Sequence, residues 1–279
     1  MCWLPGSCGL RVLRVVLGVL LVLRSGCEDR CDVLPDRSDV ERLCPHADAF
    51  LVGSSLMRAA DPALAARALV FGRVKVCGLT DPADAADAAA RGASFAGLVM
   101  VPNTPRAVSL NEARPIAGAV SIPLVGVFRN EKPMQVASTA RALGLAAVQL
   151  HGEEDALYIR GLRSLLPEGV EIWAAGAVGR EVPDPRPGAH RTLYDTKVGG
   201  RSGGTGTVFD WSRLDGREEL SGAVIAGGLT AGNAAAAGRV GAYALDVGSG
   251  VEAEPGRKDP AKLTAFFEAL RLPARGDRS

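Results

Sequence analysis

Eight short apolar runs follow one another along most of this chain, and stretches of helical composition separate most of them. The runs cover residues 74–77, 95–100, 123–128, 146–150, 170–174, 192–195, 223–226 and 242–246. Strands that alternate with helices predict βαβ units and a parallel sheet. Eight such units predict a closed α/β barrel of the (β/α)8 or TIM type, in which chemistry takes place at the carboxyl ends of the strands.

The segments between the runs carry the start and stop signals of helices. We expect helices over residues 81–91, 109–119, 133–143, 153–166 and 259–272, and a further one after Thr230. Residues 176–187 contain three prolines and little helical period, so we expect a short or missing fifth helix. The glycines of residues 199–206 predict a mobile loop where an active-site lid would lie.

The regions outside the barrel are less regular. We expect four parts: a leader (1–35), a single βα unit (36–72), the barrel (73–273) and a tail (274–279). In the leader, Arg11 and Arg14 precede an apolar run, as in a secretory signal, although this run is too short to span a bilayer. An extra buried strand or helix, or a disordered or wrongly started leader, are the other interpretations. We expect an irregular leader on a cytoplasmic protein.

Composition argues against several kinds of partner. The formal net charge is +1 and charges of both signs are interspersed, so no basic stripe is available for a nucleic acid. No cysteine pair stands beside histidines at the spacing of zinc ligands, so we expect no metal site. Only Cys77 of the six cysteines lies in the barrel segment, which is typical of a cytosolic enzyme with one useful thiol. We expect no membrane partner.

Glycine-rich turns follow the seventh and eighth apolar runs. Gly227 and Gly228 follow the seventh run, and Gly248, Ser249 and Gly250 follow the eighth. Such turns expose backbone N–H groups that can bind an anion, and barrel enzymes often bind phosphate at this place. Glycine would also permit tight turns without any ligand, but two such turns in these units predict a phosphate site.

Two reactive side chains end the first and sixth runs. Cys77 alone is ambiguous, because a free cysteine usually behaves as a small buried hydrophobe. Asp195 is more informative, because a carboxylate at the end of an apolar strand is costly unless it is solvated, paired or functional. Across the mouth of a barrel, the two groups would supply a base and an acid on opposite faces of a substrate.

Further polar residues lie near the expected mouth. Arg106 stands on a loop stiffened by prolines, where it could bind a carboxylate or be a solvated surface arginine. Gln149 and His151 end the fourth run, where they could line a pocket or only cap the strand. Asp246 ends the eighth run, and we expect it to fix the glycine turns through backbone hydrogen bonds.

Together these segments resemble the phosphoribosylanthranilate isomerase family. The matching segments run in family order from about residue 73 to 272: 74–80, 104–106, 126–128, 148–152, 195–196, 203–206, 209–211, 226–229 and 246–252. The resemblance implies a TIM barrel that performs an Amadori rearrangement of a phosphosugar, N-(5-phosphoribosyl)anthranilate, in tryptophan biosynthesis. It implies no cofactor, and we expect a monomer.

The resemblance also implies roles for individual residues. Asp195 would protonate the furanose ring oxygen, and Cys77, as a thiolate, would remove the proton from the sugar C2. The implied substrate-binding residues are Arg106, Gln149, His151, Gly227, Gly228, Asp246, Gly248 and Ser249. Thr104 stands where the family commonly has serine, and Gly248 stands where it often has serine or asparagine, which leaves the backbone donors for phosphate.

Residues 38–72 resemble the last βα unit of indole-3-glycerol-phosphate synthase, which some bacteria fuse directly upstream of the isomerase. We expect the chain to be the carboxyl-terminal part of such a fusion, without synthase activity, because nothing matches the catalytic lysines and glutamates of the synthase. Two other functions remain open. A metal-dependent phosphosugar epimerase would need more ligands than His151, and a barrel could bind ligands without catalysis.

Overall fold

The computed structural model describes residues 10–16, 19–24, 37, 40–41, 47–198, 201–202 and 208–271. Its elements fall into two compact units, of which one ends at Phe71 and the other spans Gly72–Arg271. The larger unit holds every sequence-predicted site residue.

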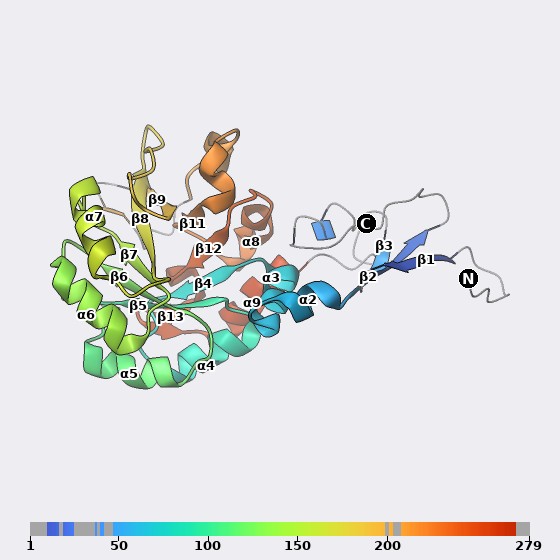
Figure 1. Ribbon diagram of the computed structural model, residues 1–279, viewed down its shortest axis with the longest axis horizontal. Helices are drawn as coiled ribbons and strands as arrows, with labels where there is room; N and C mark the ends of the chain where they lie inside the picture. Colours follow the sequence, from blue (N-terminus) through green and yellow to red (C-terminus); the bar gives the residue numbers. More distant parts are fainter. Residues whose placement is uncertain are drawn as a thin grey trace. The chain divides into compact units, whose positions relative to one another are not determined.

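Eight parallel strands form the centre of the larger unit (Figure 1). They are β4 (Val74–Cys77), β5 (Phe95–Val99), β6 (Leu124–Phe128), β7 (Ala147–Leu150), β8 (Glu171–Val178), β9 (Arg191–Val198), β11 (Val224–Ala226) and β12 (Ala244–Val247). Each strand pairs with the next, and β12 pairs with β4, so the sheet closes. The predicted TIM barrel is confirmed.

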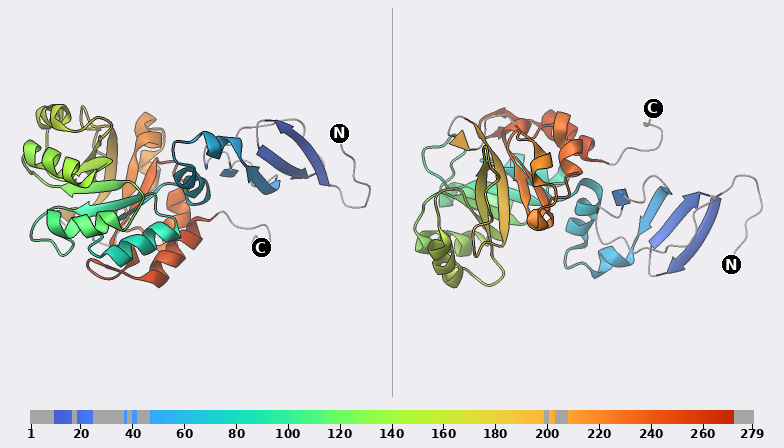
Figure 2. Two further views of the ribbon diagram at one scale, coloured as in Figure 1. Left: turned by 60° about the horizontal axis from the view of Figure 1, so that its bottom comes forward. Right: turned by 90° about the horizontal axis from the view of Figure 1, so that it is seen from above.

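Helices follow most of the strands and cover the outside of the barrel (Figures 1 and 2). They are α4 (Pro82–Arg91), α5 (Leu110–Gly118), α6 (Pro133–Leu143), α7 (Ala156–Leu165), α8 (Ala231–Gly238) and α9 (Pro260–Leu270). Asp81, Ser109 and Asp259 are N-caps whose side chains accept backbone hydrogen bonds, because these helix starts leave N–H groups without helical partners. The helix positions agree with the sequence-based prediction to within a few residues.

No helix lies between β8 and β9, as predicted for the fifth unit. The loop in its place is held by Arg186, which donates hydrogen bonds to the carbonyl oxygens of Gly152 and Ala175 at 2.7 and 2.9 Å. β8 and β9 extend beyond the predicted runs, and they pair as far as Val178 and Thr196. In the described part of the sixth unit, the helical segments are two short 3-10 helices, η1 (Trp211–Leu214) and η2 (Glu218–Gly222).

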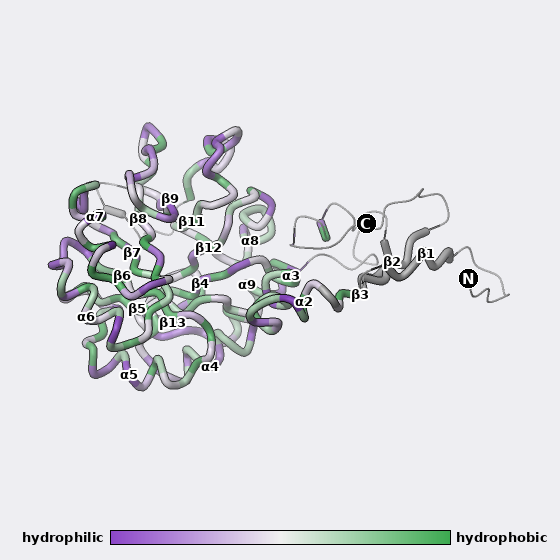
Figure 3. Tube along the Cα trace, viewed as in Figure 1, coloured by the Kyte–Doolittle hydropathy of each residue, from purple (hydrophilic) through white to green (hydrophobic). Residues whose placement is uncertain are grey.

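The barrel interior is packed with apolar side chains toward the amino ends of the strands. This core layer consists of Phe95, Val125, Ala147, Trp173, Ala175, Leu193, Val224, Ala226 and Ala244. Figure 3 shows hydrophobic residues along the barrel strands and hydrophilic residues on the surrounding loops. Because side chains alternate along a strand, the residues two positions after Leu193 and Ala244 point into the same interior, nearer the mouth. These residues are Asp195 and Asp246.

The smaller unit contains a separate antiparallel sheet. Its strands β1 (Leu10–Val16), β2 (Val19–Arg24) and β3 (Ala47–Val52) pair in that order, and α2 (Ser54–Arg58) and α3 (Pro62–Phe71) follow. The prediction of an irregular leader is wrong for residues 10–16 and 19–24, where two runs rich in branched apolar residues pair as antiparallel strands. The rest of the leader, the tail and most of the predicted lid lie outside the described residues. None of the helices described is long and apolar enough to cross a membrane.

Candidate active site

Cys77 lies at the carboxyl end of β4, where its side chain shares the barrel interior with that of Lys75. Both face Gly97 of the neighbouring strand β5. A Cβ atom at Gly97 would lie 2.9 Å from Lys75 Cε and 3.2 Å from the Cys77 sulfur. Only glycine therefore leaves room for both side chains at this level of the barrel.

Lys75 is fully buried and forms an ion pair with Asp246, whose Oδ2 lies 2.8 Å from Lys75 Nζ. Burial alone would lower the pKa of Lys75, but Asp246 and Cys77 outweigh it, so the pKa is raised and the ammonium stays charged. The expected role of Asp246 as a holder of the glycine turns is wrong, because its hydrogen-bond donor is Lys75. The other carboxylate oxygen, Oδ1, has no hydrogen-bond partner in the part of the chain described.

Burial and the nearby charges of the barrel interior determine the pKa of the Cys77 thiol. Burial raises its pKa, and the negative charge of Asp246 raises it further. Lys75, which is within hydrogen-bonding reach of the sulfur, and Lys258 act in the opposite direction. The positive group that a catalytic thiolate requires is therefore present, but it does not fully offset the effect of burial on the pKa of the thiol.

Asp195 lies in the interior near the end of β9 and is almost fully buried. Its Oδ2 atom lies 3.4 Å from Nε2 of His151, which reaches toward it from the end of β7. Burial lowers the pKa of His151, and the nearby Lys75 lowers it further, so the imidazole is largely neutral at pH 7. His151 thus faces Asp195 within the mouth, instead of only capping its strand.

Gln149 stands two residues before His151 on the same strand and is buried in the barrel interior. Its side-chain oxygen has no hydrogen-bond partner among the described residues. A buried amide oxygen without a partner is costly, so this atom is available to a donor on a ligand.

The two predicted glycine turns lie side by side at the ends of β11 and β12. Gly227 and Gly228 have φ angles of +87° and +66°, which favour glycine. A Cβ atom at Gly227 would lie 2.6 Å from Oδ1 of Asp195, so this turn packs directly on the candidate acid. Gly250 is equally constrained, because a Cβ there would collide with the carbonyl of Leu229.

Both glycine turns lead into helical turns. Thr230 is the N-cap of α8, as predicted, and Asn233 fixes this start by accepting from the Thr230 N–H and donating to the Gly228 carbonyl. Gly248 precedes the short 3-10 helix η3 (Ser249–Val251). Backbone N–H groups at such positions favour an anion.

Arg106 is neither a solvated arginine nor a free one. Its Nε and Nη2 atoms donate to the two carboxylate oxygens of Glu252 at 2.8 and 2.5 Å. Its aliphatic stem lies over Gly78, the residue after Cys77, where a Cβ atom would approach Arg106 Cδ to 2.5 Å. The loop that carries Arg106 is thereby fixed beside the candidate base.

Sequence reasoning assigned no role to four charged residues that organise this mouth. They are Lys75, Glu154, Glu252 and Lys258. Glu154 accepts from the backbone N–H groups of Asn130 and Gly152 at 2.6 and 2.9 Å, and so ties together the loops after β6 and β7. The sequence does indicate the position of Lys75. It lies in a four-residue strand two positions before Cys77, so its side chain must face the same side of the sheet as the Cys77 thiol. The described residues contain no cluster of three or more His, Cys, Asp or Glu side chains placed to hold a metal ion.

The barrel segment is similar to a known protein family. The family described as N-(5'phosphoribosyl)anthranilate (PRA) isomerase matches residues 74–269. The tryptophan biosynthesis protein TrpCF of Vibrio cholerae is 43% identical over 255 residues, which make up 91% of this chain and 52% of that protein. TrpCF of Salmonella typhi is 43% identical over 83% of this chain and 50% of its own length. The chain thus spans about half the length of these relatives.

Solved isomerase structures cover about 71% of the chain. Phosphoribosyl anthranilate isomerase from Thermus thermophilus superposes with a TM-score of 0.62 at 31% identity, over 71% of this chain and 98% of that one. The enzyme from Thermotoga maritima gives a TM-score of 0.61 at 34% identity, over 71% and 98%. The chain belongs to the N-(5'-phosphoribosyl)anthranilate isomerase family.

Proposed function

We propose that this chain converts N-(5-phosphoribosyl)anthranilate to 1-(2-carboxyphenylamino)-1-deoxyribulose 5-phosphate. The observation that carries the proposal is the arrangement of the mouth, in which Cys77 and Asp195 end the first and sixth strands of one closed barrel. A related isomerase structure, 32% identical to this chain with a TM-score of 0.59 over 71% and 97% of the two chains, is a complex with reduced 1-(o-carboxyphenylamino)-1-deoxyribulose 5-phosphate.

The reaction moves protons and needs no net oxidation. The Asp195 carboxyl group donates a proton to the furanose ring oxygen while the anilino nitrogen pushes its lone pair toward C1, and the ring opens to a Schiff base. The Cys77 thiolate then removes the proton from C2, and the electron pair forms an enolamine. Protonation at C1 with loss of the hydroxyl proton at C2 completes the aldose-to-ketose change.

The remaining site residues bind the two ends of the substrate. Gly227, Gly228, Gly248 and Ser249 bind the phosphate through backbone donors, because their turns lead into helical N-termini on one side of the mouth. Arg106 binds the anthranilate carboxylate on the side of β4 and β5. Gln149 offers its unpartnered side-chain oxygen to a sugar hydroxyl, and His151 and Asp246 line the space between.

Turnover of freshly generated substrate by the purified chain tests the function. Anthranilate emission from the substrate should fall at a rate proportional to protein concentration, and the carboxyphenylamino-deoxyribulose phosphate should accumulate. A chain that begins near Phe71 should keep this activity, because every proposed site residue lies in Gly72–Arg271. Unchanged fluorescence at micromolar protein would contradict the proposal.

The pH dependence of catalysis should depend on Asp246. Asp246→Asn removes a negative charge that raises the pKa of Cys77. It also leaves the Cys77 thiolate as the remaining group that holds the buried Lys75 in its charged form, so the ammonium pairs with the thiolate instead of with Asp246. The pKa of the thiol should therefore fall, and the ascending limb of the kcat/KM–pH profile should move to lower pH. Asp215→Asn, an exposed change of the same kind, should leave the profile where it is. A profile that stays in place in Asp246→Asn would contradict the assignment of Cys77 as the base.

We further propose that residues 36–72 derive from the last βα unit of an indole-3-glycerol-phosphate synthase and that residues 73–273 form the isomerase domain. In support, the match to the Vibrio cholerae protein covers 91% of the chain, more than residues 74–279 can account for. The similarity therefore reaches upstream of the isomerase barrel. No indole-glycerol phosphate should form in the turnover assay, because the described part of this unit supplies only β3 and its two helices.

A further inference from the structure

A short hairpin after β12 carries two buried charges. Its strands are β13 (Glu252–Glu254) and β14 (Arg257–Lys258). The side chains of Glu252 and Lys258 are 4% and 1% exposed, and their Oε1 and Nζ atoms lie 2.8 Å apart. Burial of an ion pair carries a large desolvation cost, so stability alone explains this pair poorly.

The pair connects the two loops that carry the candidate base and the candidate carboxylate receptor. Lys258 Nζ also donates to the carbonyl oxygen of Cys77 at 2.6 Å. Glu252 binds Arg106 through both of its oxygens. The tip of the hairpin is anchored as well, because the Thr80 hydroxyl donates to the Gly256 carbonyl at 2.5 Å.

The charge state of Glu252 supports this arrangement. Burial by itself would raise its pKa, but the hydrogen bonds from Arg106 and Lys258 outweigh burial and lower it. Glu252 is therefore an anion at neutral pH. Glu252 faces Lys258, whose pKa is lowered by burial, and Arg106, whose pKa is raised by the hydrogen bond to Glu252. The guanidinium therefore stays charged and can pair with an incoming carboxylate.

The geometry of the guanidinium shows what Glu252 leaves open. An arginine side chain has five N–H donors arranged along two edges, one formed by Nε and Nη2 and the other by Nη1 and Nη2. Glu252 occupies the first edge completely. Within the described chain, Nη1 has no hydrogen-bond partner, so the second edge keeps its donors and has a fixed orientation.

We propose that Glu252 is a positioning residue that holds one edge of Arg106 so that the other edge receives the anthranilate carboxylate, and that Lys258 couples this receptor to the strand end that carries Cys77. The proposal rests on the proposed function. It implies that Glu252 determines selectivity for substrates that carry an ortho carboxylate, although Glu252 itself repels such a group.

The test compares two stable inhibitors in the wild-type chain and in Glu252→Gln. One inhibitor is the reduced product, and the other is the same compound without the carboxylate. In the wild type we expect the carboxylate to tighten inhibition by about 10- to 100-fold, as for hydrogen bonds between charged groups. In Glu252→Gln this preference should fall by at least about tenfold, while the inhibitor without the carboxylate binds as before.

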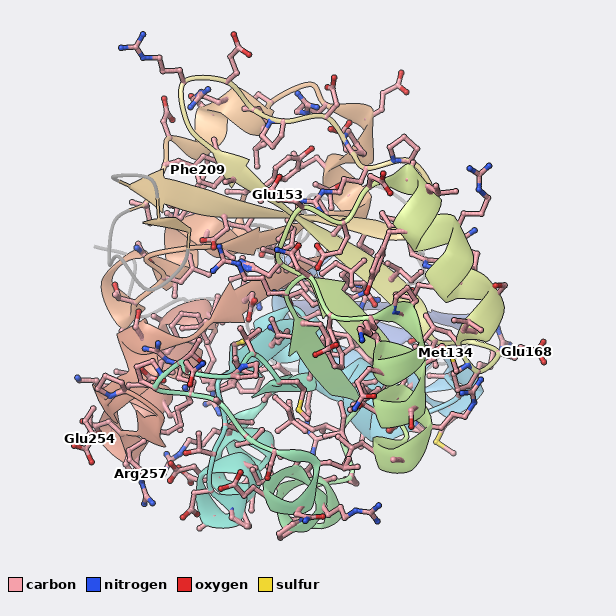
Figure 4. All side chains as sticks on the ribbon, turned by 90° about the vertical axis from the view of Figure 1, so that its left-hand side faces the viewer. Met134, Glu153, Glu168, Phe209, Glu254 and Arg257 are labelled. Carbon is pink, nitrogen blue, oxygen red and sulfur yellow. The ribbon has the colours of Figure 1, made fainter. Side chains whose placement is uncertain are left out.

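Kinetic measurements and a matched control complete the test. Glu252→Gln should raise KM with little change in kcat, and it should have no further effect on KM in an Arg106→Met background, because it acts through Arg106. Glu254→Gln is the control, since Glu254 is exposed on the same hairpin and points away from the barrel (Figure 4). It should leave both inhibition constants unchanged.

The outcomes separate the two proposals. If neither inhibitor binds to the wild type and no substrate is turned over, the proposed function fails. If the wild type binds and turns over substrate, but Glu252→Gln keeps the full preference for the carboxylate, the role of Glu252 is refuted. The role of Glu252 is also refuted if Glu252→Gln weakens both inhibitors equally, or if it raises KM as much in the Arg106→Met background as in the wild type. Either result would indicate a general loss of structure.

Discussion

Replacement of Cys77 with alanine should lower kcat by about 10²- to 10⁴-fold, the usual contribution of a general base. Without the sulfur, no group at the end of β4 can take the proton from C2, because Lys75 is a buried ammonium paired with Asp246. The substrate should still bind, since the proposed phosphate turns and Arg106 belong to other strand ends. Steady-state kinetics with freshly generated substrate measure kcat and KM.

Binding of the reduced product provides the control for Cys77→Ala. Its dissociation constant should stay close to the wild-type value, which would show that the barrel, the proposed phosphate turns and the proposed carboxylate site at Arg106 are intact. Cys77→Ser should also be nearly inactive, because a hydroxyl is a far weaker base than a thiolate. Near-normal kcat in both variants would show that the proton is removed by another group and that the assignment of Cys77 is wrong.

The fold could be predicted from the sequence because its signals are local. Each short apolar run formed a strand, and Asp81, Ser109 and Asp259 cap helices that begin one residue later. The prolines of residues 176–187 correctly indicated the missing fifth helix. The predicted lengths of β8 and β9 were too short. The ends of these strands pair with each other up to Val178 and Thr196, and this pairing depends on tertiary structure and not on the composition of either segment.

The site was only partly predictable, because its charges are arranged by contacts between distant segments. Cys77, Asp195 and the glycine turns end strands, so barrel topology brings them to one mouth. By contrast, Arg106 and Glu252 are 146 positions apart, and Lys75 and Asp246 are 171 apart. Nothing local to Asp246 indicates that its partner is a lysine inside the barrel. For the same reason, a hydrogen-bonding role with the nearby glycines was wrongly expected.

Replacement of Asp195 with asparagine should also lower kcat by about 10²- to 10⁴-fold, because an amide cannot deliver a proton to the ring oxygen. Asparagine has nearly the same shape as aspartate, so it should fit in the same space. On one side Oδ2 of Asp195 lies 3.4 Å from His151 Nε2, and on the other side Oδ1 lies so close to Gly227 that a Cβ atom added there would be 2.6 Å away. Stability and inhibitor binding should therefore change little. The effect should appear in kcat, measured by loss of anthranilate fluorescence.

The matched control for Asp195→Asn is Asp184→Asn, on the loop that replaces the fifth helix. The Asp184 side chain is 94% exposed and forms a surface ion pair with Arg217, so this change should leave kcat and KM unchanged. The two acid–base variants should also differ in which step they block. Asp195→Asn should accumulate the closed-ring substrate on the enzyme, whereas Cys77→Ala should still open the ring and exchange no proton at C2. If Asp195→Asn retained wild-type kcat while Cys77→Ala did not, ring opening would be unassisted or would depend on another acid, and the assignment of Asp195 would be wrong.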